Sequence, residues 1–373
     1  MYLWQMKEFT LFIYKKENIQ SIVQELTLIL GEVRGIMQGF SKEVLDDVFV
    51  QIMLSEAIQT SQIEGEYFSR EDVMSSLKMN LGLESIHRPT ANVKADAVAK
   101  LMIEVKKDFT KPLTLQLLLD WHKILMSNEN RIQSGAIRQG AEPMQVISGH
   151  YGEIEVHYEA PPSKSLPELL NQFIAWYQSF EDKEFGIIGD AMITSALAHL
   201  YFETLHPFED GNGRIGRALA EKVLAERLDM PIFLNISHAI ELDKKKYYEE
   251  IKKAQRDLNV SDWIVYFCDV LLSAIKNTKN VATHTLNKTK FFDRYSDQLN
   301  KREIKAINKM FDAGPSGFEG GMTAKKYMSI NKTSKPTATR DLQHLTEIGA
   351  FTQHGGGRSV YYELNMEPYN HLF

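Results

Sequence analysis

Residues 206–217 bring together, in one short stretch, most of the side chains that a phosphate-directed reaction requires. The segment reads His-Pro-Phe-Glu-Asp-Gly-Asn-Gly-Arg-Ile-Gly-Arg. An unperturbed histidine has a pKa of about 6.5, so near neutral pH His206 can accept a proton from an attacking hydroxyl. Asp210 supplies a carboxylate oxygen, and Mg²⁺ in proteins typically binds one or two carboxylates together with substrate phosphates. The segment therefore offers a general base close in sequence to a magnesium ligand.

The second half of the same segment is suited to binding an anion. Gly211 and Gly213 tolerate positive φ and let the backbone approach a ligand closely. Asn212 can turn its side-chain amide toward phosphate oxygens. Arg214 and Arg217 lie on neighbouring positions of a helix, and a planar guanidinium can bind phosphate through two parallel hydrogen bonds. These residue types predict a phosphate-transfer site that contains its own base.

Two helices are expected to position this segment. Apolar residues recur at three-to-four spacing from Ile188 to Phe202, which predicts a buried helix. That helix should end near His206, because Pro207 disfavours helical geometry in the residue before it. Helical spacing resumes after Gly213. The glycine-rich segment is thus predicted to be a loop leading into a helix N-terminus, where backbone N–H groups and the helix dipole favour phosphate.

Residues 206–217 also resemble, at every defined position, the signature of the Fic family, H-x-F-x-[D/E]-G-N-G-R-x-x-R. The resemblance implies a mainly helical core that transfers AMP from ATP to a Ser, Thr or Tyr hydroxyl of a protein and releases pyrophosphate. It implies that His206 deprotonates the target hydroxyl and that Asp210 holds Mg²⁺ on the α and β phosphates. Residues 211–213 would cradle the phosphates, Arg214 would contact the bridging phosphates, and Arg217 would reach the γ-phosphate.

An inhibitory motif is predicted near the N-terminus. Residues 60–65, Thr-Ser-Gln-Ile-Glu-Gly, match [S/T]-x-x-x-E-[G/N], a pattern that accompanies Fic cores. Thr60 and Glu64 lie on one helix face, and Gly65 suits a helix C-terminus. The resemblance implies that Glu64 pairs with Arg217, occupies the γ-phosphate site and restrains the enzyme.

Two related reactions use the same residues. A branch of the family that phosphorylates its target carries alanine at the position of Gly211 and lysine at that of Gly213. This chain has neither, which favours AMP transfer. Removal of AMP from a modified protein, with Glu64 positioning water, is an alternative that the sequence leaves open.

Residues 143–158 are predicted to form a β-hairpin. Ile154, Val156 and Tyr158 alternate with polar residues, and residues 149–152 are turn-forming. The pattern by itself favours a structural hairpin. The Fic resemblance instead implies a flap that binds the protein target by strand addition, with Val146, Ile154 and Val156 at the docking edge.

The end of the chain is predicted to be a small α+β domain. From residue 301 onward, three helices are expected, followed by a hairpin with glycines at residues 355–357. This order resembles a winged helix-turn-helix. Four basic residues fall where such domains contact phosphates, namely Lys332, Lys335, Arg340 and Arg358. DNA is therefore a candidate partner, and docking to a protein or dimerisation is the alternative.

Length and composition indicate a soluble protein of several domains. The 373 residues are 43% hydrophobic and 25% charged, and the net charge of −6 gives no general reason to expect nucleic-acid affinity. The single cysteine, Cys268, excludes an internal disulfide framework, and no apolar run is long enough to cross a bilayer. We expect a cytoplasmic protein, with a homo-oligomer compatible with the sequence. The predicted division is a helical region with the inhibitory motif (1–105), the catalytic core (106–276), a polar linker (277–300) and the C-terminal domain (301–373).

Two alternative functions belong to other classes. His199, Glu203 and His206 are spaced so that they can line one helix face as the metal ligands of a hydrolase. That arrangement leaves the anion-binding residues without a role. The second alternative is a DNA-binding regulator in which the Fic-like core is an accessory, and the intact 206–217 segment argues against it. The protein target of an AMP transferase is not specified, and the chain itself is one candidate.

Overall fold

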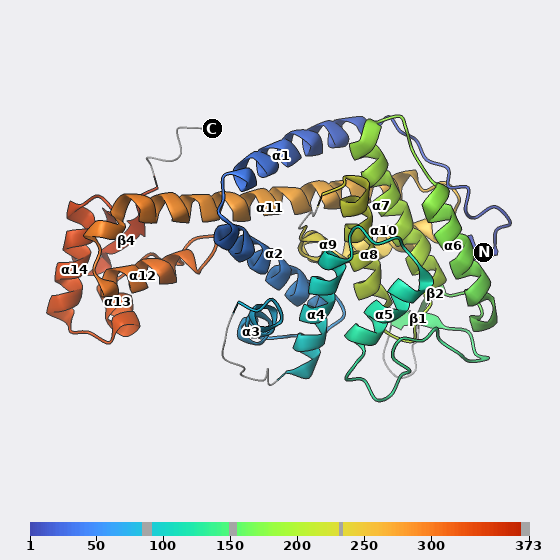
Figure 1. Cartoon of the computed structure of the whole chain (residues 1–373), viewed down its shortest axis with the longest axis horizontal. Coiled ribbons are helices and arrows are strands. Elements are labelled where there is room, and N and C mark those ends of the chain that lie inside the picture. The colour runs from blue at the N-terminus through green and yellow to red at the C-terminus, as the bar shows by residue number, and fades with distance from the viewer. Residues whose placement is uncertain (84–91, 149–154, 231–233, 367–373) are drawn as a thin grey trace. The chain divides into compact units, whose positions relative to one another are not determined.

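A computed structural model covers the chain, and it describes residues 1–83, 92–148, 155–230 and 234–366 (Figure 1). The protein is mainly helical and divides into two compact units. The first unit comprises residues 1–32 and 49–278, and the second comprises residues 33–48 and 279–373. Among the residues that are described, none of the helices is both long and apolar enough to span a bilayer.

Residues 1–295 form helices and one pair of strands. At the start of several helices, a polar side chain caps the backbone N–H groups of the first turn. Ser69, Asn92 and Thr114 accept hydrogen bonds from backbone N–H groups at the starts of α3, α4 and α5, as polar N-cap residues do. The elements in chain order are η1 (Leu3–Gln5), α1 (Gln20–Gln38), α2 (Lys42–Ile63), α3 (Arg70–Asn80), α4 (Val93–Lys107), α5 (Leu115–Leu125), β1 (Gln145–Ser148), β2 (Glu155–Glu159), η2 (Ser163–Ser165), α6 (Leu166–Ser179), α7 (Gly186–Leu205), α8 (Asn212–Arg227), α9 (Ile236–Glu241), α10 (Lys244–Ala254) and α11 (Ser261–Tyr295).

Helix α7 is buried on all sides and packs against α8. Its residues from Gly189 to Leu205 are all buried, in agreement with the predicted buried helix. Where the two helices meet, a Cβ on Gly216 would collide with the Glu203 carboxylate, and Ser195 Oγ donates a hydrogen bond to the Ala220 carbonyl at 2.8 Å. Small residues therefore let the two helices that flank residues 206–211 approach each other closely.

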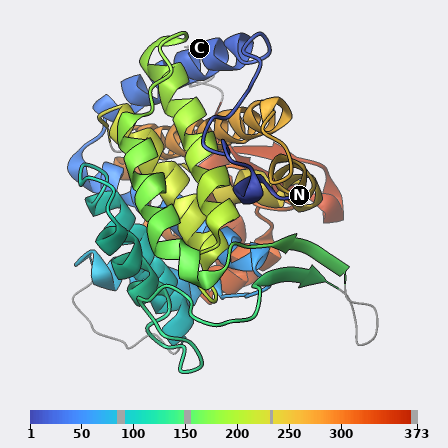
Figure 2. The same ribbon diagram turned by 90° about the vertical axis from the view of Figure 1, so that its right-hand side faces the viewer.

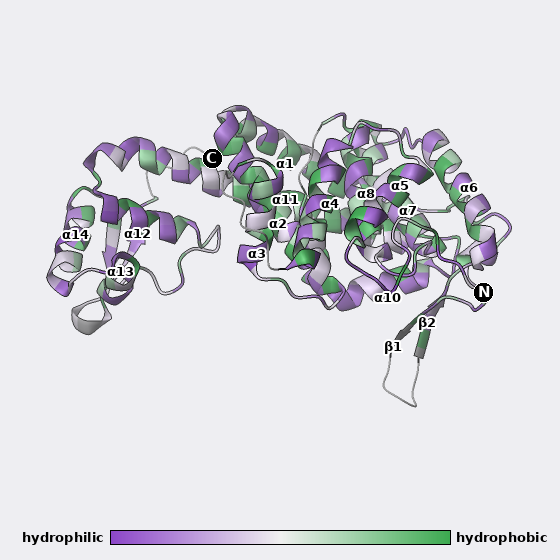
Figure 3. Ribbon diagram, turned by 60° about the horizontal axis from the view of Figure 1, so that its bottom comes forward, coloured by the Kyte–Doolittle hydropathy of each residue, from purple (hydrophilic) through white to green (hydrophobic). Residues whose placement is uncertain are grey.

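Strands β1 and β2 form the predicted hairpin and extend away from the helices of the first unit (Figures 2 and 3). They pair antiparallel, with Gln145 opposite Glu159 and Val146 opposite Tyr158, and the register shifts after Val146. The buried Tyr158 side chain anchors the base of the hairpin, because its hydroxyl donates to the Thr204 carbonyl at 2.5 Å. The predicted turn at residues 149–152, together with residues 153–154, lies outside the described residues.

The predicted linker at residues 277–300 is helical for most of its length. Helix α11 runs without interruption from Ser261 to Tyr295. The segment is polar in composition, but it contains neither proline nor glycine, and the buried residues Ala282, Phe291 and Tyr295 recur along it. The boundary between the two units, after residue 278, falls within this helix, and the role of residues 277–300 as a linker stays a prediction.

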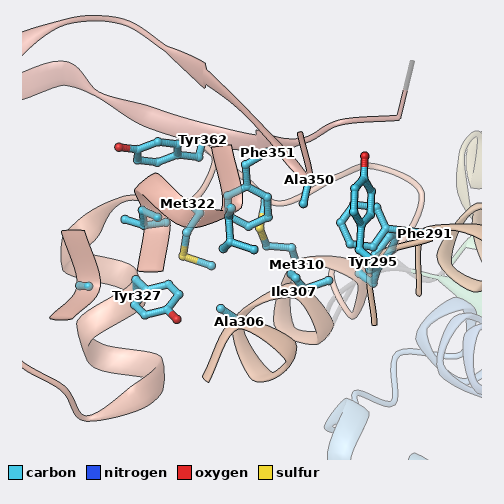
Figure 4. Close-up of a cluster of buried hydrophobic side chains, with 14 residues drawn as sticks. Phe291, Tyr295, Ala306, Ile307, Met310, Met322, Tyr327, Ala350, Phe351 and Tyr362 are labelled. Carbon is cyan, nitrogen blue, oxygen red and sulfur yellow. The ribbon is translucent and has the colours of Figure 1, made fainter. Parts of the chain in front are cut away.

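The C-terminal part of the second unit has its own hydrophobic core (Figure 4). Its elements are η3 (Ser296–Gln298), α12 (Lys301–Phe311), α13 (Ala324–Asn331), α14 (Lys335–Glu347), β3 (Phe351–His354), η4 (Gly357–Ser359) and β4 (Tyr361–Leu364). Strands β3 and β4 pair antiparallel, and Met322 forms a bridge to Tyr362. The three helices and the hairpin follow one another in the predicted order. Met310, Met322, Tyr327 and Phe351 are among the side chains that fill the core (Figure 4).

Candidate active site

Residues 206–211 form a short loop that joins α7 to α8. Helix α7 ends at His206, whose backbone is left-handed with φ of 47° and whose N–H donates to the Phe202 carbonyl at 3.0 Å. Helix α8 begins at Asn212, with Gly211 as its N-cap at φ of 82°. A Cβ on Gly211 would meet the ends of the flexible Met126 and Leu125 side chains, which can shift, so the left-handed φ is what favours glycine here. The loop and helix start are where the sequence predicts them.

The Asn212 side chain differs from its predicted orientation. Its amide oxygen accepts from the Phe208 N–H at 2.9 Å, and its amide nitrogen donates to the Phe208 carbonyl at 2.8 Å. Asn212 is 3% exposed, and the buried Phe208 ring stacks on His122 with centroids 4.0 Å apart. The amide therefore holds the loop in shape instead of facing a ligand.

His206 is held by an arginine that the sequence did not single out. Arg138 Nε donates to the His206 carbonyl at 2.8 Å, and the Arg138 backbone N–H donates to the Pro207 carbonyl at 2.9 Å. Burial, reinforced by the positive charge of Arg138, lowers the pKa of His206 to about 4. The imidazole is therefore neutral near pH 7 and can accept a proton. No local pattern marks Arg138, because its partners are distant in sequence.

Glu203 lies behind His206 in the buried core. Its Oε2 is 3.8 Å from His206 Nδ1, and its Oε1 has no hydrogen-bond partner among the described residues. Burial raises the pKa of Glu203 to about 8, so near pH 7 the carboxyl group retains its proton and adds no charge beside the imidazole.

The metal-hydrolase arrangement is not formed. His199 Nε2 lies 2.9 Å from the Tyr247 hydroxyl, and its ring stacks on Trp263. Within the part of the chain that the structure describes, His, Cys, Asp and Glu side chains form no group of three that suits a metal ion. His199 is thus a buried core residue, and burial lowers its pKa to about 3.

Asp210 is one of two exposed acidic residues of the loop, beside Glu209. Its side chain is 60% exposed, and Oδ1 accepts from the Gly211 N–H at 2.5 Å and from Arg214 Nη2 at 3.4 Å. An accessible carboxylate at the start of α8 fits the usual way in which Mg²⁺ binds, through one or two protein carboxylates and substrate phosphates.

Arg217 is clamped by two residues of the predicted inhibitory motif. Its guanidinium donates to Glu64 Oε1 at 2.8 Å, to Thr60 Oγ1 at 2.9 Å and to the Thr60 carbonyl at 3.0 Å. Arg217 is 1% exposed. Burial alone would lower its pKa, but the Glu64 carboxylate outweighs burial, and the pKa is raised. A Cβ on Gly213 would collide with the same Glu64 oxygen, so glycine is required for Glu64 to lie here.

Arg214 is bound by an acidic residue that the sequence did not single out. Glu66 Oε2 accepts from Arg214 Nη1 at 2.7 Å, and Glu66 Oε1 accepts from Lys94 Nζ at 2.9 Å. Lys94 also pairs with Glu129 at 2.5 Å. One sequence feature points to Glu66, which directly follows Gly65 of the predicted inhibitory motif. Its partners come from other helices, so the motif does not predict these contacts.

Residues 112–224 match the profile of the Fic/DOC family, and residues 2–83 match a domain of unknown function, DUF4172. The protein adenylyltransferase Fic of Aedes aegypti is 27% identical over 198 residues, which cover 52% of this chain and 35% of that protein. The chain therefore spans only about a third of the length of this relative.

Two solved structures have the same fold over most of their length. A Fic family protein from Desulfovibrio desulfuricans G20 aligns with a TM-score of 0.57 and 18% identity, over 94% of this chain and 97% of that one. A Fic domain-containing signaling protein from Bacteroides thetaiotaomicron aligns with a TM-score of 0.53 and 19% identity, over 70% of this chain and 96% of that one. At this identity the likeness shows the fold alone.

Proposed function

Since this chain contains a Fic/DOC domain, we propose that it transfers AMP from ATP to a hydroxyl group of a protein. The observation that carries this proposal is the junction of α7 and α8. There a neutral histidine, an exposed carboxylate and two buried arginines lie within one loop and the first turns of one helix. The name of the Aedes aegypti relative, a protein adenylyltransferase, supports the same reaction.

In the proposed reaction, His206 accepts the proton of the target hydroxyl. The hydroxyl oxygen forms a bond to the α-phosphorus of ATP, and the bond from that phosphorus to the bridging oxygen breaks, which releases pyrophosphate. A pKa of about 4 leaves the imidazole neutral at physiological pH, so the base is available without prior deprotonation. Arg138 fixes the position of this base through the His206 carbonyl.

The phosphates of ATP are proposed to bind at the start of α8. Its first backbone N–H groups point toward the loop, and the helix dipole favours an anion there. Arg214 would contact the bridging phosphates and Arg217 the γ-phosphate, each through its planar guanidinium. Asp210 would hold Mg²⁺, which on binding would neutralise charge on the phosphates. Positioning and charge stabilisation of this kind account for most catalysis in phosphoryl-type transfer.

The described conformation is proposed to be restrained. The Glu64 carboxylate accepts a hydrogen bond from the Arg217 guanidinium, the group that would otherwise bind the γ-phosphate. Thr60 holds the other side of that guanidinium, which explains why a hydroxyl residue precedes the glutamate by one helical turn. Release of Glu64 would leave Arg217 in place and free to bind phosphate.

The hairpin is proposed to dock the target segment by adding a strand. Val156 is 38% exposed, and it lies on β2, which among the described residues pairs with β1 alone. Val146 pairs across from the anchored Tyr158. Ile154, the third predicted docking residue, lies outside the described residues.

A second proposal concerns the C-terminal unit, in which α12 to β4 would act as a winged helix that binds DNA. Lys332, Lys335 and Arg340 are exposed on α14 or just before it, whereas Ala338 and Leu342 of the same helix are buried. A basic outer face on the third helix is what phosphate contacts require. Binding of duplex DNA that weakens steeply as salt rises would support this proposal, and absent or salt-insensitive binding would contradict it.

The reaction is tested with ATP labelled separately on the α and γ phosphates. Wild type, Glu64→Gly and Glu64→Gly/His206→Ala are incubated with Mg²⁺ and either a cell lysate or no other protein. Covalent α-label that is stronger in Glu64→Gly and lost with His206→Ala is the expected result. Covalent γ-label would show a kinase, and the absence of any label would contradict AMP transfer and favour AMP removal, to be tested on an AMP-modified protein.

A further inference from the structure

Glu66 bridges two cations that come from different helices. One of its carboxylate oxygens accepts from Arg214 of α8 at 2.7 Å, and the other accepts from Lys94 at the start of α4 at 2.9 Å. The carboxylate therefore presents one oxygen to each cation. A phosphate group can present two of its oxygens to the same pair of cations in the same way.

The Arg214 guanidinium is not fully satisfied by the acidic residues around it. The side chain is 6% exposed, and its Nε atom is buried without a hydrogen-bond partner among the described residues. A buried N–H group without a partner is costly, and a guanidinium has five donors to satisfy. Besides Glu66, Asp210 contacts Arg214 only at 3.4 Å. Arg214 can therefore accept a ligand with more acceptor oxygens than one carboxylate has.

Glu64 and Glu66 lie on one tight turn at the end of α2, and each side chain pairs with an arginine of α8. The Gly65 and Glu66 N–H groups bond back to the last turn of α2, and Gly65 adopts φ of 81°. As a result Glu64 reaches Arg217 and Glu66 reaches Arg214, so each of the two arginines receives one carboxylate. Movement of this turn would expose both guanidinium groups together.

We propose that Glu66 occupies the place of a phosphate group, and that Arg214 and Lys94 form a phosphate-binding subsite when Glu66 leaves. Lys94 thereby becomes a ligand-binding residue, which neither its sequence context nor the Fic-like segment indicates. Without Glu66, Lys94 keeps its pair with Glu129 at 2.5 Å and Arg214 keeps only the 3.4 Å contact with Asp210, so the hydrogen-bond donors that Glu66 now satisfies become available to an anion. That this anion is the phosphate chain of ATP rests on the proposed function, but the anion site itself does not.

The test measures the dissociation constant of inorganic pyrophosphate in the presence of Mg²⁺ by calorimetry, at fixed ionic strength, on the full chain. The variants are Glu66→Gln and Glu66→Gln/Lys94→Gln. The control for loss of one acidic charge is Glu104→Gln, whose carboxylate also pairs with a lysine and is 35% exposed, against 25% for Glu66. The control for loss of the lysine is Glu66→Gln/Lys100→Gln, because the side chains of Lys94 and Lys100 are 47% and 48% exposed.

Glu66→Gln should bind pyrophosphate about fivefold more tightly than wild type, as expected when a competing, partly exposed charged contact is removed. Adding Lys94→Gln should abolish most of that gain, whereas adding Lys100→Gln should preserve it. Equal tightening in Glu66→Gln and Glu104→Gln, or equal losses from the two lysine changes, would overturn the subsite. Because pyrophosphate binding is read without turnover, the subsite can fail while AMP transfer stands, and AMP transfer can fail while the subsite stands.

Discussion

Replacing Glu64 by glutamine is expected to raise the rate of AMP transfer about tenfold. A hydrogen bond to a charged group typically contributes about 1.5–3 kcal/mol to stability. The Glu64 side chain is 30% exposed, so solvent screening places its contact with Arg217 near the lower end of that range. About 1.4 kcal/mol corresponds to a tenfold change in an equilibrium. Glutamine keeps the volume of the side chain, and Thr60 still holds Arg217 in position for the γ-phosphate.

The assay is the initial rate at which the α-phosphate label enters protein, at an ATP concentration below half-saturation. Glu104→Gln is the matched control, because its side chain is 35% exposed and its carboxylate pairs with Lys107 on the same helix, away from the loop. An unchanged rate for Glu64→Gln, in protein that still binds ATP, would refute the restraint. An equal rise in Glu104→Gln would show that net charge, and not the contact with Arg217, controls the rate.

Three further outcomes are expected for the loop between α7 and α8. Since burial lowers the pKa of His206 to about 4, AMP transfer should be near its full rate at neutral pH and should fall as the pH drops toward 4, in initial-rate measurements on folded protein. The unfolded chain binds this proton at about pH 6.5 and the folded chain does not, so the free energy of unfolding should decrease from pH 6.5 toward pH 4. His206 therefore lowers the urea midpoint at pH 5 relative to pH 7, whereas Glu203, whose pKa is raised to about 8, acts in the opposite direction; the change attributable to His206 is the part that His206→Gln removes. Asn212→Ala should lower the free energy of unfolding by about 1–3 kcal/mol and reduce transfer, because both backbone polar groups of Phe208 lose their partner; an unchanged urea midpoint would contradict a clamp. Asp210→Asn should require more Mg²⁺ for half-maximal transfer, and a superimposable Mg²⁺ titration would contradict its role as a ligand.

The sequence determined much of the local structure around the candidate site. Pro207 and the glycines set the end of α7 and the start of α8, because they restrict or relax the backbone within one or two residues. The spacing of Thr60 and Glu64 placed them on one helix face, and both contact Arg217. The helix ends and the shared face follow from local patterns, whereas the pairing of Glu64 with Arg217, 153 residues away in sequence, was implied by the Fic resemblance.

Residue type alone did not predict the helical conformation of residues 277–295 or the contacts of the Asn212 side chain. The segment from residue 277 onward is rich in polar residues, yet α11 continues to Tyr295, and Ala282, Phe291 and Tyr295 are buried along it. Asn212 carries an amide that suits phosphate, but the neighbouring Phe208 backbone binds that amide first. A residue type shows what a side chain can bind, whereas its surroundings decide what it does bind.

The tertiary structure alone decided which charged residues outside residues 206–217 contact the site. Arg138, Glu66 and Lys94 come from segments far from residues 206–217, and no local pattern predicts their contacts with the site, although Glu66 directly follows the predicted inhibitory motif. Their roles arise because packing brings distant polar groups together in a buried region, where each donor or acceptor needs a partner and each charge needs a counter-charge. By itself, the sequence determined which residues could do the chemistry, and the packing of helices decided the protonation of His206 and the occupancy of both arginines.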